Sequence, residues 1–260
     1  MRIVFIAPEE PFVIPTFFAE VLPATGDDDV ALAIVKPLYR GSTWFSQAKR
    51  FARAFGVRDL LSEGAAYTRL RLLDLTYRVS GRGRPRSLST LAREHGIPVF
   101  MPREVNAEDF LGQLRTFSPD MVISVACPQI FGEALLELPP LGCINVHSSL
   151  LPTYRGVLPT FWALANGERE TGVTVHRIDS QIDGGGIIAQ RRIPVRADDT
   201  LHSLMVRCKV VAAQLIIESL GRFRDGKPDV LPNAVEAGSY RSFPTASDVA
   251  RFRRRGRRLR

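Results

Sequence analysis

Cysteine is scarce in this sequence, and the few thiols are not placed to form bridges. Cys127, Cys143 and Cys208 are odd in number, and no two of them are spaced as C-x-x-C. This pattern argues against a disulfide framework and a cysteine-based zinc site, so we expect reduced thiols and no metal. No run approaches the ~20 apolar residues of a membrane span, and the apolar start is too short for a secretory signal. A cytoplasmic protein is therefore expected.

Lysine is also scarce, because arginine supplies most of the positive charge. Only four of the 35 basic residues are lysine, and the formal net charge is +8. Seven arginines and no acidic residue lie within 251–260, so the rest of the chain carries a net charge of only +1. We expect the tail to be solvated, and binding to nucleic acid or another anionic partner stays an alternative.

The composition is otherwise that of a globular protein, with 45% apolar and 24% charged residues. Short β-rich runs with little polar alternation are separated by helical patterns, which is typical of parallel strands covered on both faces. The expected strands are 3–7, 30–35, 98–101, 121–125, 143–146, 172–177 and 186–195. The expected helices are 14–21, 87–95, 107–117, 160–166 and 198–220. This order predicts an α/β fold with a doubly wound, mostly parallel sheet.

Residues 40–86 interrupt the alternation of strands and helices. Their apolar residues recur at helical spacing between basic ones, which predicts a helical insertion packed on the sheet. A helix that binds a partner or a membrane surface is the alternative. The last 40 residues, 221–260, are too few for another ordinary domain. We therefore expect one domain over 1–220, with 40–86 as its insertion, and a short C-terminal extension that carries the arginine-rich tail.

Two polar side chains lie near the end of the predicted strand in the segment LGCINVHSSLLPTYRG, residues 141–156. Asn145 and His147 are two apart on an extended stretch, so their side chains emerge on the same face. They lie at the edge where open α/β sheets bind ligands. An amide that stabilises an oxyanion and an imidazole that exchanges a proton suit acyl transfer. Taken alone, however, an N-x-H pair is more typical of a structural histidine.

A second polar cluster begins at Asp179 and ends in Asp183 and three glycines. The glycines permit positive backbone dihedrals and the close approach of a ligand to the main chain. A carboxylate at Asp183 could form a hydrogen bond with His147, which would fix the tautomer of the imidazole and raise the pKa of His147. An ordinary Asp-Gly hairpin turn explains the segment equally well.

Taken in order, these segments resemble the 10-formyltetrahydrofolate-dependent formyltransferases, which act on glycinamide ribonucleotide, methionyl-tRNA or amino sugars of nucleotide-sugar pathways. The similarity covers roughly residues 120–220 and consists of LGCINVH, SLLP, YRG, ETGVTVH and IDGGGII in succession. It implies a Rossmann-like formyltransferase that uses 10-formyltetrahydrofolate as co-substrate and no metal.

The resemblance also implies a role for individual residues. Asn145 matches the residue that forms a hydrogen bond to the formyl oxygen and to the tetrahedral oxyanion. His147 matches the catalytic histidine. Asp183 matches the aspartate that polarises this histidine and relays a proton toward the folate nitrogen. The pterin is expected at Cys127, Pro128, Gln129 and Ile130 and at Asp179, Ser180, Gln181 and Ile182. Ser149, Tyr154, Arg155 and Trp162 are candidates for shaping the acceptor site, whereas His176 and His202 are expected to be structural.

The acceptor is inferred from what this chain lacks relative to the family. The segment APEEP, residues 7–11, has no glycine-rich phosphate loop like that of the glycinamide ribonucleotide branch. Methionyl-tRNA enzymes carry a further C-terminal β-barrel, for which residues 221–260 are too short. We therefore expect a small primary amine, an amino sugar linked to a nucleotide, and no nucleic-acid partner. Methionyl-tRNA formyltransferase, 10-formyltetrahydrofolate hydrolase and a noncatalytic folate- or RNA-binding module remain alternatives, and a homodimer is expected by analogy.

Overall fold

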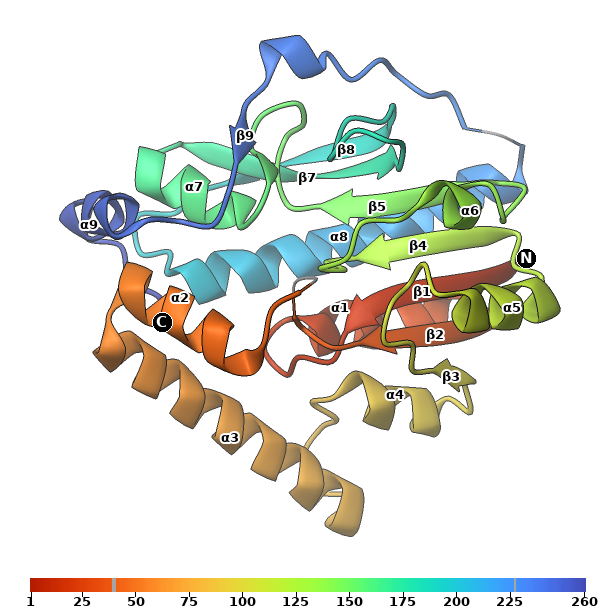
Figure 1. Cartoon of the computed structure of the whole chain (residues 1–260), viewed down its shortest axis with the longest axis horizontal. Coiled ribbons are helices and arrows are strands. Elements are labelled where there is room, and N and C mark those ends of the chain that lie inside the picture. The colour runs from red at the N-terminus through yellow and green to blue at the C-terminus, as the bar shows by residue number, and fades with distance from the viewer. Residues whose placement is uncertain (39–40, 227) are drawn as a thin grey trace.

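A seven-stranded sheet forms the centre of the molecule (Figure 1). The computed structural model describes residues 1–38, 41–226 and 228–260. The sheet order is β3-β2-β1-β4-β5-β7-β8, and the first five strands are parallel, whereas β7 and β8 are antiparallel. The strands are β1 (Arg2–Pro8), β2 (Asp29–Val35), β3 (Val99–Phe100), β4 (Met121–Val125), β5 (Cys143–His147), β7 (Glu170–Arg177) and β8 (Ile187–Pro194). The predicted doubly wound, mostly parallel sheet is confirmed.

Both faces of the sheet are covered, as the unbroken apolar runs predicted. In β1, Ile3 and Phe5 pack on one side and Val4 and Ile6 on the other, in two separate cores. The first core includes α1 (Ile14–Ala24), α4 (Leu88–Glu94), α7 (Pro159–Asn166) and α8 (Leu201–Arg224). The second includes α5 (Glu108–Phe117) and α6 (Glu133–Leu136). At the expected start of α8, Thr200 and Ser203 form a reciprocal capping box.

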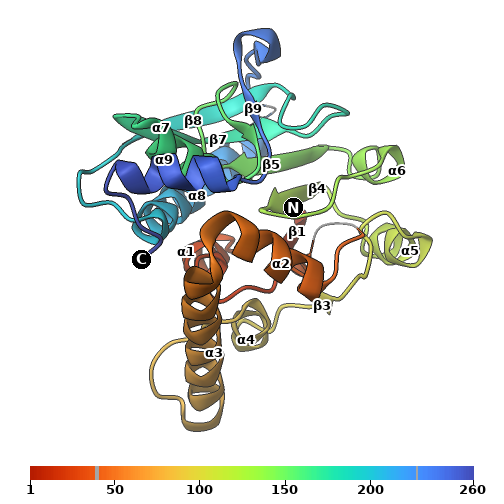
Figure 2. The same ribbon diagram turned by 60° about the vertical axis from the view of Figure 1, so that its left-hand side comes forward.

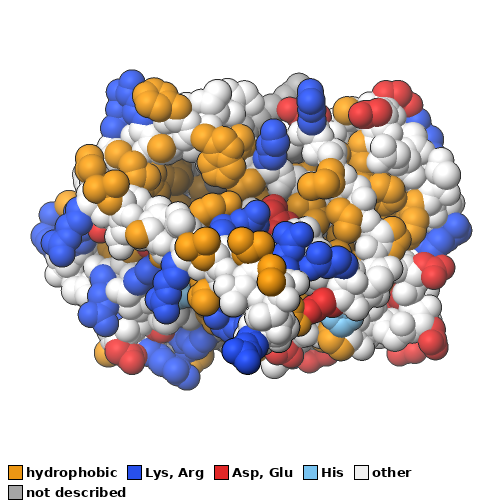
Figure 3. Space-filling model, turned by 90° about the horizontal axis from the view of Figure 1, so that it is seen from below, with side chains coloured by type: hydrophobic (Ala, Val, Ile, Leu, Met, Phe, Trp, Pro, Cys, Tyr) orange, Lys and Arg blue, Asp and Glu red, His pale blue; other side chains and the backbone are white. Residues whose placement is uncertain are grey.

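The segment predicted as a helical insertion contains two helices, α2 (Trp44–Phe55) and α3 (Val57–Ser80). Its first residue, 40, lies outside the described residues. Among the residues of α3 only Asp74 is buried, and Figure 2 shows the helix projecting away from the sheet. Apolar side chains on this side of the molecule are interspersed with those of Lys and Arg (Figure 3). The expectation that the whole insertion packs on the sheet is therefore wrong for α3, because several of its apolar side chains, such as Leu61, Leu72 and Val79, are exposed.

The C-terminal segment packs on the body of the molecule, which corrects the expectation of a solvated tail, although several of its arginines stay exposed. Residues Ala246–Arg254 form α9, whose Phe252 stacks on Phe161 of α7 at 5.0 Å between ring centroids. Arg253 donates a hydrogen bond to the Phe55 carbonyl at the end of α2, and Arg255 donates to the Ala165 carbonyl in the last turn of α7. Helix C-termini carry unpaired carbonyls and partial negative charge, which arginines neutralise. The tail thus fastens α2 and α7 together.

Two short strands join distant parts of the chain. Strand β6 (Arg155–Gly156) pairs in parallel with β9 (Tyr240–Arg241), and a 3-10 turn (Val235–Ala237) precedes β9. This pairing holds the C-terminal extension over the loop that follows β5. None of the helices in the described parts of the chain is long and apolar enough to cross a membrane.

Candidate functional site

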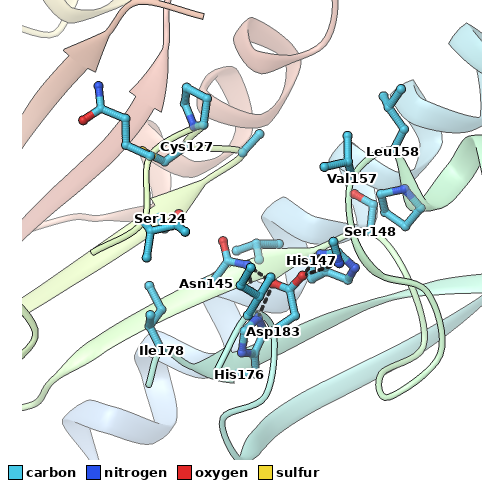
Figure 4. A pocket seen from close by; sticks show the side chains of 18 of the residues that line it. Ser124, Cys127, Asn145, His147, Ser148, Val157, Leu158, His176, Ile178 and Asp183 are labelled. Carbon is cyan, nitrogen blue, oxygen red and sulfur yellow. Dashed lines mark hydrogen bonds and ion pairs between the residues drawn. The ribbon is translucent and has the colours of Figure 1, made fainter. Parts of the chain in front are cut away.

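A cavity of about 460 Å³ opens at the carboxyl ends of β4 and β5. The sheet order reverses direction beside β4, and crevices at such switch points are the usual ligand sites of doubly wound folds. Asn145, His147 and Asp183 all line this cavity. Figure 4 shows the three side chains turned toward one another at one side of the cavity, with Cys127 and Ser124 on another. The structure therefore brings together the three residues predicted to be catalytic.

Strand pairing explains how the site is assembled. Asn145 and His147 are alternate residues of β5, so they face the same side, and β7 lies antiparallel beside them. The loop between β7 and β8 then returns Asp183 to the same place. Asp183 Oδ2 lies 3.5 Å from His147 Nδ1. The backbone of Asp183 has a positive φ of 49°, which is strained for a residue other than glycine and is typical of functional sites.

His147 is held as a neutral base. Its Nε2 atom lies 2.8 Å from the Tyr154 carbonyl oxygen, which can only accept, so Nε2 carries the hydrogen. Nδ1 is then free to take a proton beside the Asp183 carboxylate. Burial lowers the pKa of His147, while the charge of Asp183 opposes that change. A proton that arrives at Nδ1 creates an imidazolium ion next to a carboxylate that stabilises it.

The amide nitrogen of Asn145 faces two polar groups of the site. Its Nδ2 atom lies 3.1 Å from His176 Nε2 and donates to Asp183 Oδ1 at 3.3 Å. His176 Nε2 and Asp183 Oδ1 are themselves 3.5 Å apart. These contacts hold the Asn145 amide beside the cavity, where it can meet a bound oxygen.

Asp183 is kept ionised despite its burial. Burial alone would raise the pKa of this carboxyl, but His147, His176 and the Gly156 N–H, 2.7 Å from Oδ2, together hold the pKa well below its usual range. Asn233 of the C-terminal extension donates to the carbonyls of Asp183 and Gly185, which fixes the loop. A permanently charged carboxylate can polarise His147 throughout the neutral pH range.

The glycines after Asp183 serve the packing of the chain on itself. A Cβ atom at Gly185 would lie 2.1 Å from the Arg177 carbonyl oxygen, and one at Gly186 would lie 2.3 Å from a Val230 methyl. The positive φ falls on Asp183, and none of the three glycines has one. The expectation of positive glycine dihedrals and close ligand approach at these positions is therefore corrected.

The segments expected to hold a pterin both line the cavity. They are Cys127, Pro128, Gln129 and Ile130 after β4, and Asp179, Ser180, Gln181 and Ile182 before Asp183. The Gln129 amide holds its own loop, because it accepts from the Val105 N–H and donates to the Arg103 carbonyl. Burial raises the pKa of the Cys127 thiol to about 12, so this thiol is not a nucleophile at neutral pH.

The four residues expected at the acceptor site do not line the cavity. Ser149 is fully buried and donates to the Thr153 carbonyl. Tyr154 and Trp162 are buried, the Tyr154 hydroxyl bonds Glu168 and Asn166, and the Trp162 N–H donates to the Val157 and Ser242 carbonyls. Arg155 donates to the Ile182 carbonyl. These side chains lie beside the cavity and hold neighbouring segments, and only the buried Nε atom of Arg155 lacks a hydrogen-bond partner among them.

Three residues of the site were missed from the sequence. His176, expected to be structural, lies opposite Asn145 in the β5–β7 register and beside Asp183. Asn233 holds the Asp183 loop, and Lys209 of α8 lines the cavity. No cluster of three or more metal-ligating side chains occurs among the residues that the structure describes.

The fold and the site together define an α/β enzyme equipped for acyl-group transfer. The sequence model of the family described as "Formyl transferase" matches residues 76–220, more than half of the sequence. The chain belongs to the formyl transferase family. The resemblance inferred from the sequence is thereby confirmed, together with the class of enzyme that it implies.

Relatives and solved structures place the chain within this family. Methionyl-tRNA formyltransferase of Geobacter metallireducens is 42% identical over 152 residues, which is 57% of this chain and 49% of the relative. The same enzyme of Kosmotoga olearia is 40% identical over 172 residues, covering 65% and 55%. A sugar N-formyltransferase from Shewanella sp FDAARGOS_354 superposes with a TM-score of 0.60 at 16% identity, over 98% of this chain and 87% of that one. Glycinamide ribonucleotide transformylase 1 from Symbiobacterium toebii gives 0.60 at 18%, over 89% and 94%. These structures show the shared fold alone.

The relatives correct the expected acceptor. Proteins named methionyl-tRNA formyltransferase share 38–42% identity with this chain, so the preference for a nucleotide-linked amino sugar is wrong. The expectation of no nucleic-acid partner loses its support for the same reason, because these relatives are named for a tRNA substrate. The chain matches only about half the length of these curated relatives. The shortness of residues 221–260 therefore gave no valid argument against an RNA acceptor.

Proposed function

We propose that this protein transfers the formyl group of 10-formyltetrahydrofolate to the α-amine of methionyl-tRNA. The observation that carries the proposal is the Asn145–His147–Asp183 cluster in the cavity, in a chain whose relatives bear that name. The cavity suits the tip of such an acceptor, since only the aminoacyl end of the RNA has to reach the cluster. The body of the RNA would lie outside it.

The residues perform the transfer in two steps. The acceptor nitrogen forms a bond to the formyl carbon, and the carbonyl electron pair moves to the formyl oxygen. The Asn145 amide donates a hydrogen bond to this oxyanion, and His147 Nδ1 takes the proton that the amine loses. The intermediate then collapses, the bond from the formyl carbon to folate N10 breaks, and N10 receives the proton. Asp183 stabilises the imidazolium ion between the two transfers.

The folate lies, in this proposal, against the two segments that flank the cluster. The loop after β4 and the loop before Asp183 both line the cavity, and the backbone groups of such loops can offer donors and acceptors to a pterin ring. Ile130 and Ile182 are exposed and supply apolar surface at the rim, where the rest of the folate would emerge. Burial of such surface by the ligand is favourable.

The acceptor is tested by mass spectrometry of the aminoacyl group after incubation of charged tRNA with 10-formyltetrahydrofolate. We expect formylmethionine on methionyl initiator tRNA with the wild-type protein, loss of the product with His147→Ala, and no loss with His95→Ala. His95 is exposed and outside the cavity, so it is the matched control. Tetrahydrofolate release without any acceptor would point to a hydrolase, and folate binding without turnover would point to a noncatalytic module. Either result would overturn the proposal.

A further inference from the structure

One buried cation in the cavity wall has no partner within the described chain. Lys209 projects from α8, is 5% exposed, and lines the same cavity as His147 and Asp183. No hydrogen bond or ion pair from a described residue reaches its ammonium group. Taking an ammonium ion out of water is costly unless another group compensates its charge. An unpaired lysine held in a ligand cavity therefore points to a charge supplied by the ligand.

The nearest acidic group does not fill that role. Glu10, just before α1, attracts Lys209 electrostatically, but the two do not form an ion pair. The carboxylate of Glu10 is already occupied, because it accepts hydrogen bonds from the backbone N–H groups of Phe12, Val13 and Ile14. The positive end of α1 also compensates its charge. Glu10 thus has its own partners, and Lys209 remains the less compensated of the two.

The position of Lys209 separates it from the proposed folate segments. Helices α1 and α8 pack together in the core on one face of the sheet, whereas the loop after β4 leads to α6 on the other face (Figure 1). Val13 and Met205 line the cavity on the same side as Lys209, since Met205 is one helical turn away on α8. Val13 and Met205 thus supply apolar surface beside the positive charge of Lys209. In such surroundings that charge acts strongly on an anion.

We propose that Lys209 is the cation of a phosphate subsite in the acceptor part of the cavity. The inference rests on the proposed function and deepens it. The subsite takes the phosphate that neighbours the aminoacylated ribose, and a single ammonium ion suits a singly charged phosphodiester. Lysine binds phosphate as a point charge, without the planar geometry that arginine requires. A free nucleotide offers the same chemistry with a terminal phosphate, and the probes below separate the two sources.

The subsite is tested by calorimetric titration of the full chain with adenosine, AMP and the dinucleotide CpA. Adenosine has no phosphate, AMP has a terminal phosphate, and CpA has a phosphodiester. We expect wild-type protein to bind CpA at least about tenfold more tightly than adenosine, the scale of one charge-assisted contact. In Lys209→Met this preference should disappear, and in Lys209→Arg it should be kept in part. Lys49→Met, which removes an exposed lysine outside the cavity, should leave it unchanged.

The outcomes separate the subsite from the proposed function. A preference for AMP without one for CpA would support the phosphate subsite and assign it to a free nucleotide. Equal binding of all three probes to the wild-type protein would overturn the subsite, whatever the stability of the variants. An unchanged preference in Lys209→Met would overturn it as well. If the wild-type protein did not formylate methionyl-tRNA, the proposed function would be wrong. The titrations would still decide whether Lys209 binds phosphate.

A kinetic measurement adds a second readout where turnover is observed. Lys209→Met should raise the KM for the charged acceptor by about tenfold or more and leave the KM for the folate within about twofold. An equal rise in both constants, with a lower melting temperature, would show that Lys209 only supports the fold and would contradict the subsite.

Discussion

The carboxylate of Asp183 lies 3.5 Å from the Nδ1 atom of His147, although 36 residues separate the two along the chain. The pairing is made possible by β7, which runs antiparallel to β5 and ends in the loop that carries Asp183. Because Nε2 is occupied by the Tyr154 carbonyl, the contact falls on the one nitrogen that can take a proton. The Tyr154 carbonyl therefore sets the tautomer of His147, and the same arrangement places Asp183 as the counter-ion of the nitrogen that acts as the base.

The contact predicts how activity depends on pH. Burial lowers the pKa of His147 below its ordinary value of 6.5, so kcat/KM should fall only at pH values below that point. Asp183 raises this pKa in part, and Asp183→Asn removes the charge. The acidic limb of the variant should therefore move to lower pH, while its plateau falls by about 10²–10⁴-fold. A pH profile of kcat/KM for both proteins checks this, and a limb that moves to higher pH would contradict the assignment.

His176 is expected to act by positioning other groups. Its Nε2 atom lies 3.1 Å from the amide nitrogen of Asn145 and 3.5 Å from Asp183 Oδ1, so His176→Phe should leave both less well oriented. Loss of one hydrogen bond should lower kcat by about tenfold. The KM for the folate should stay within about twofold, and His176→Gln should restore part of kcat because it keeps an acceptor. If His176 had only a structural role, His176→Phe would lower the melting temperature and would not lower kcat selectively while the KM for the folate stays constant.

Much of this site could be predicted from the sequence. The spacing of Asn145 and His147 placed both on one face of a strand, and the family resemblance supplied Asp183. The role of His176 could not be predicted, because it depends on strand pairing. His176 lies opposite Asn145 only in the observed antiparallel register of β5 and β7. Lys209 escaped because no local pattern shows that α8 turns this residue into the cavity.

For a related reason, the sequence did not show that the expected acceptor residues lie outside the cavity lining or that the tail packs on the body of the molecule. Tyr154 and Trp162 have the side chains of a binding site, yet tertiary packing buries them and pairs their polar groups. The seven terminal arginines have the composition of a solvated tail. Some of them instead bond carbonyl groups, as Arg255 does at Ala165, and others pair with carboxylates, as Arg260 does with Glu63. No charge pattern along the sequence reveals such partners.

The docked tail makes a stability prediction. Arg257 donates to the carbonyls of Arg196, Ala197 and Asp199 near the start of α8. Arg257→Met should lower the free energy of unfolding by about 1–2 kcal/mol, after allowance for partial exposure. Arg254→Met is the matched control, because Arg254 is exposed and makes no hydrogen bond or ion pair with a described residue. Urea unfolding of both variants checks the difference, and equal destabilisation would show that these carbonyl contacts contribute nothing.

The central claim is that His147 performs the proton transfer that accompanies formyl transfer. Its most direct test is the single-turnover rate of formylation of methionyl-tRNA by excess enzyme loaded with 10-formyltetrahydrofolate. For His147→Ala we predict a rate about 10²–10⁴-fold below that of the wild-type protein, with folate affinity retained. A variant that binds the folate and transfers the formyl group at the wild-type rate would contradict the account.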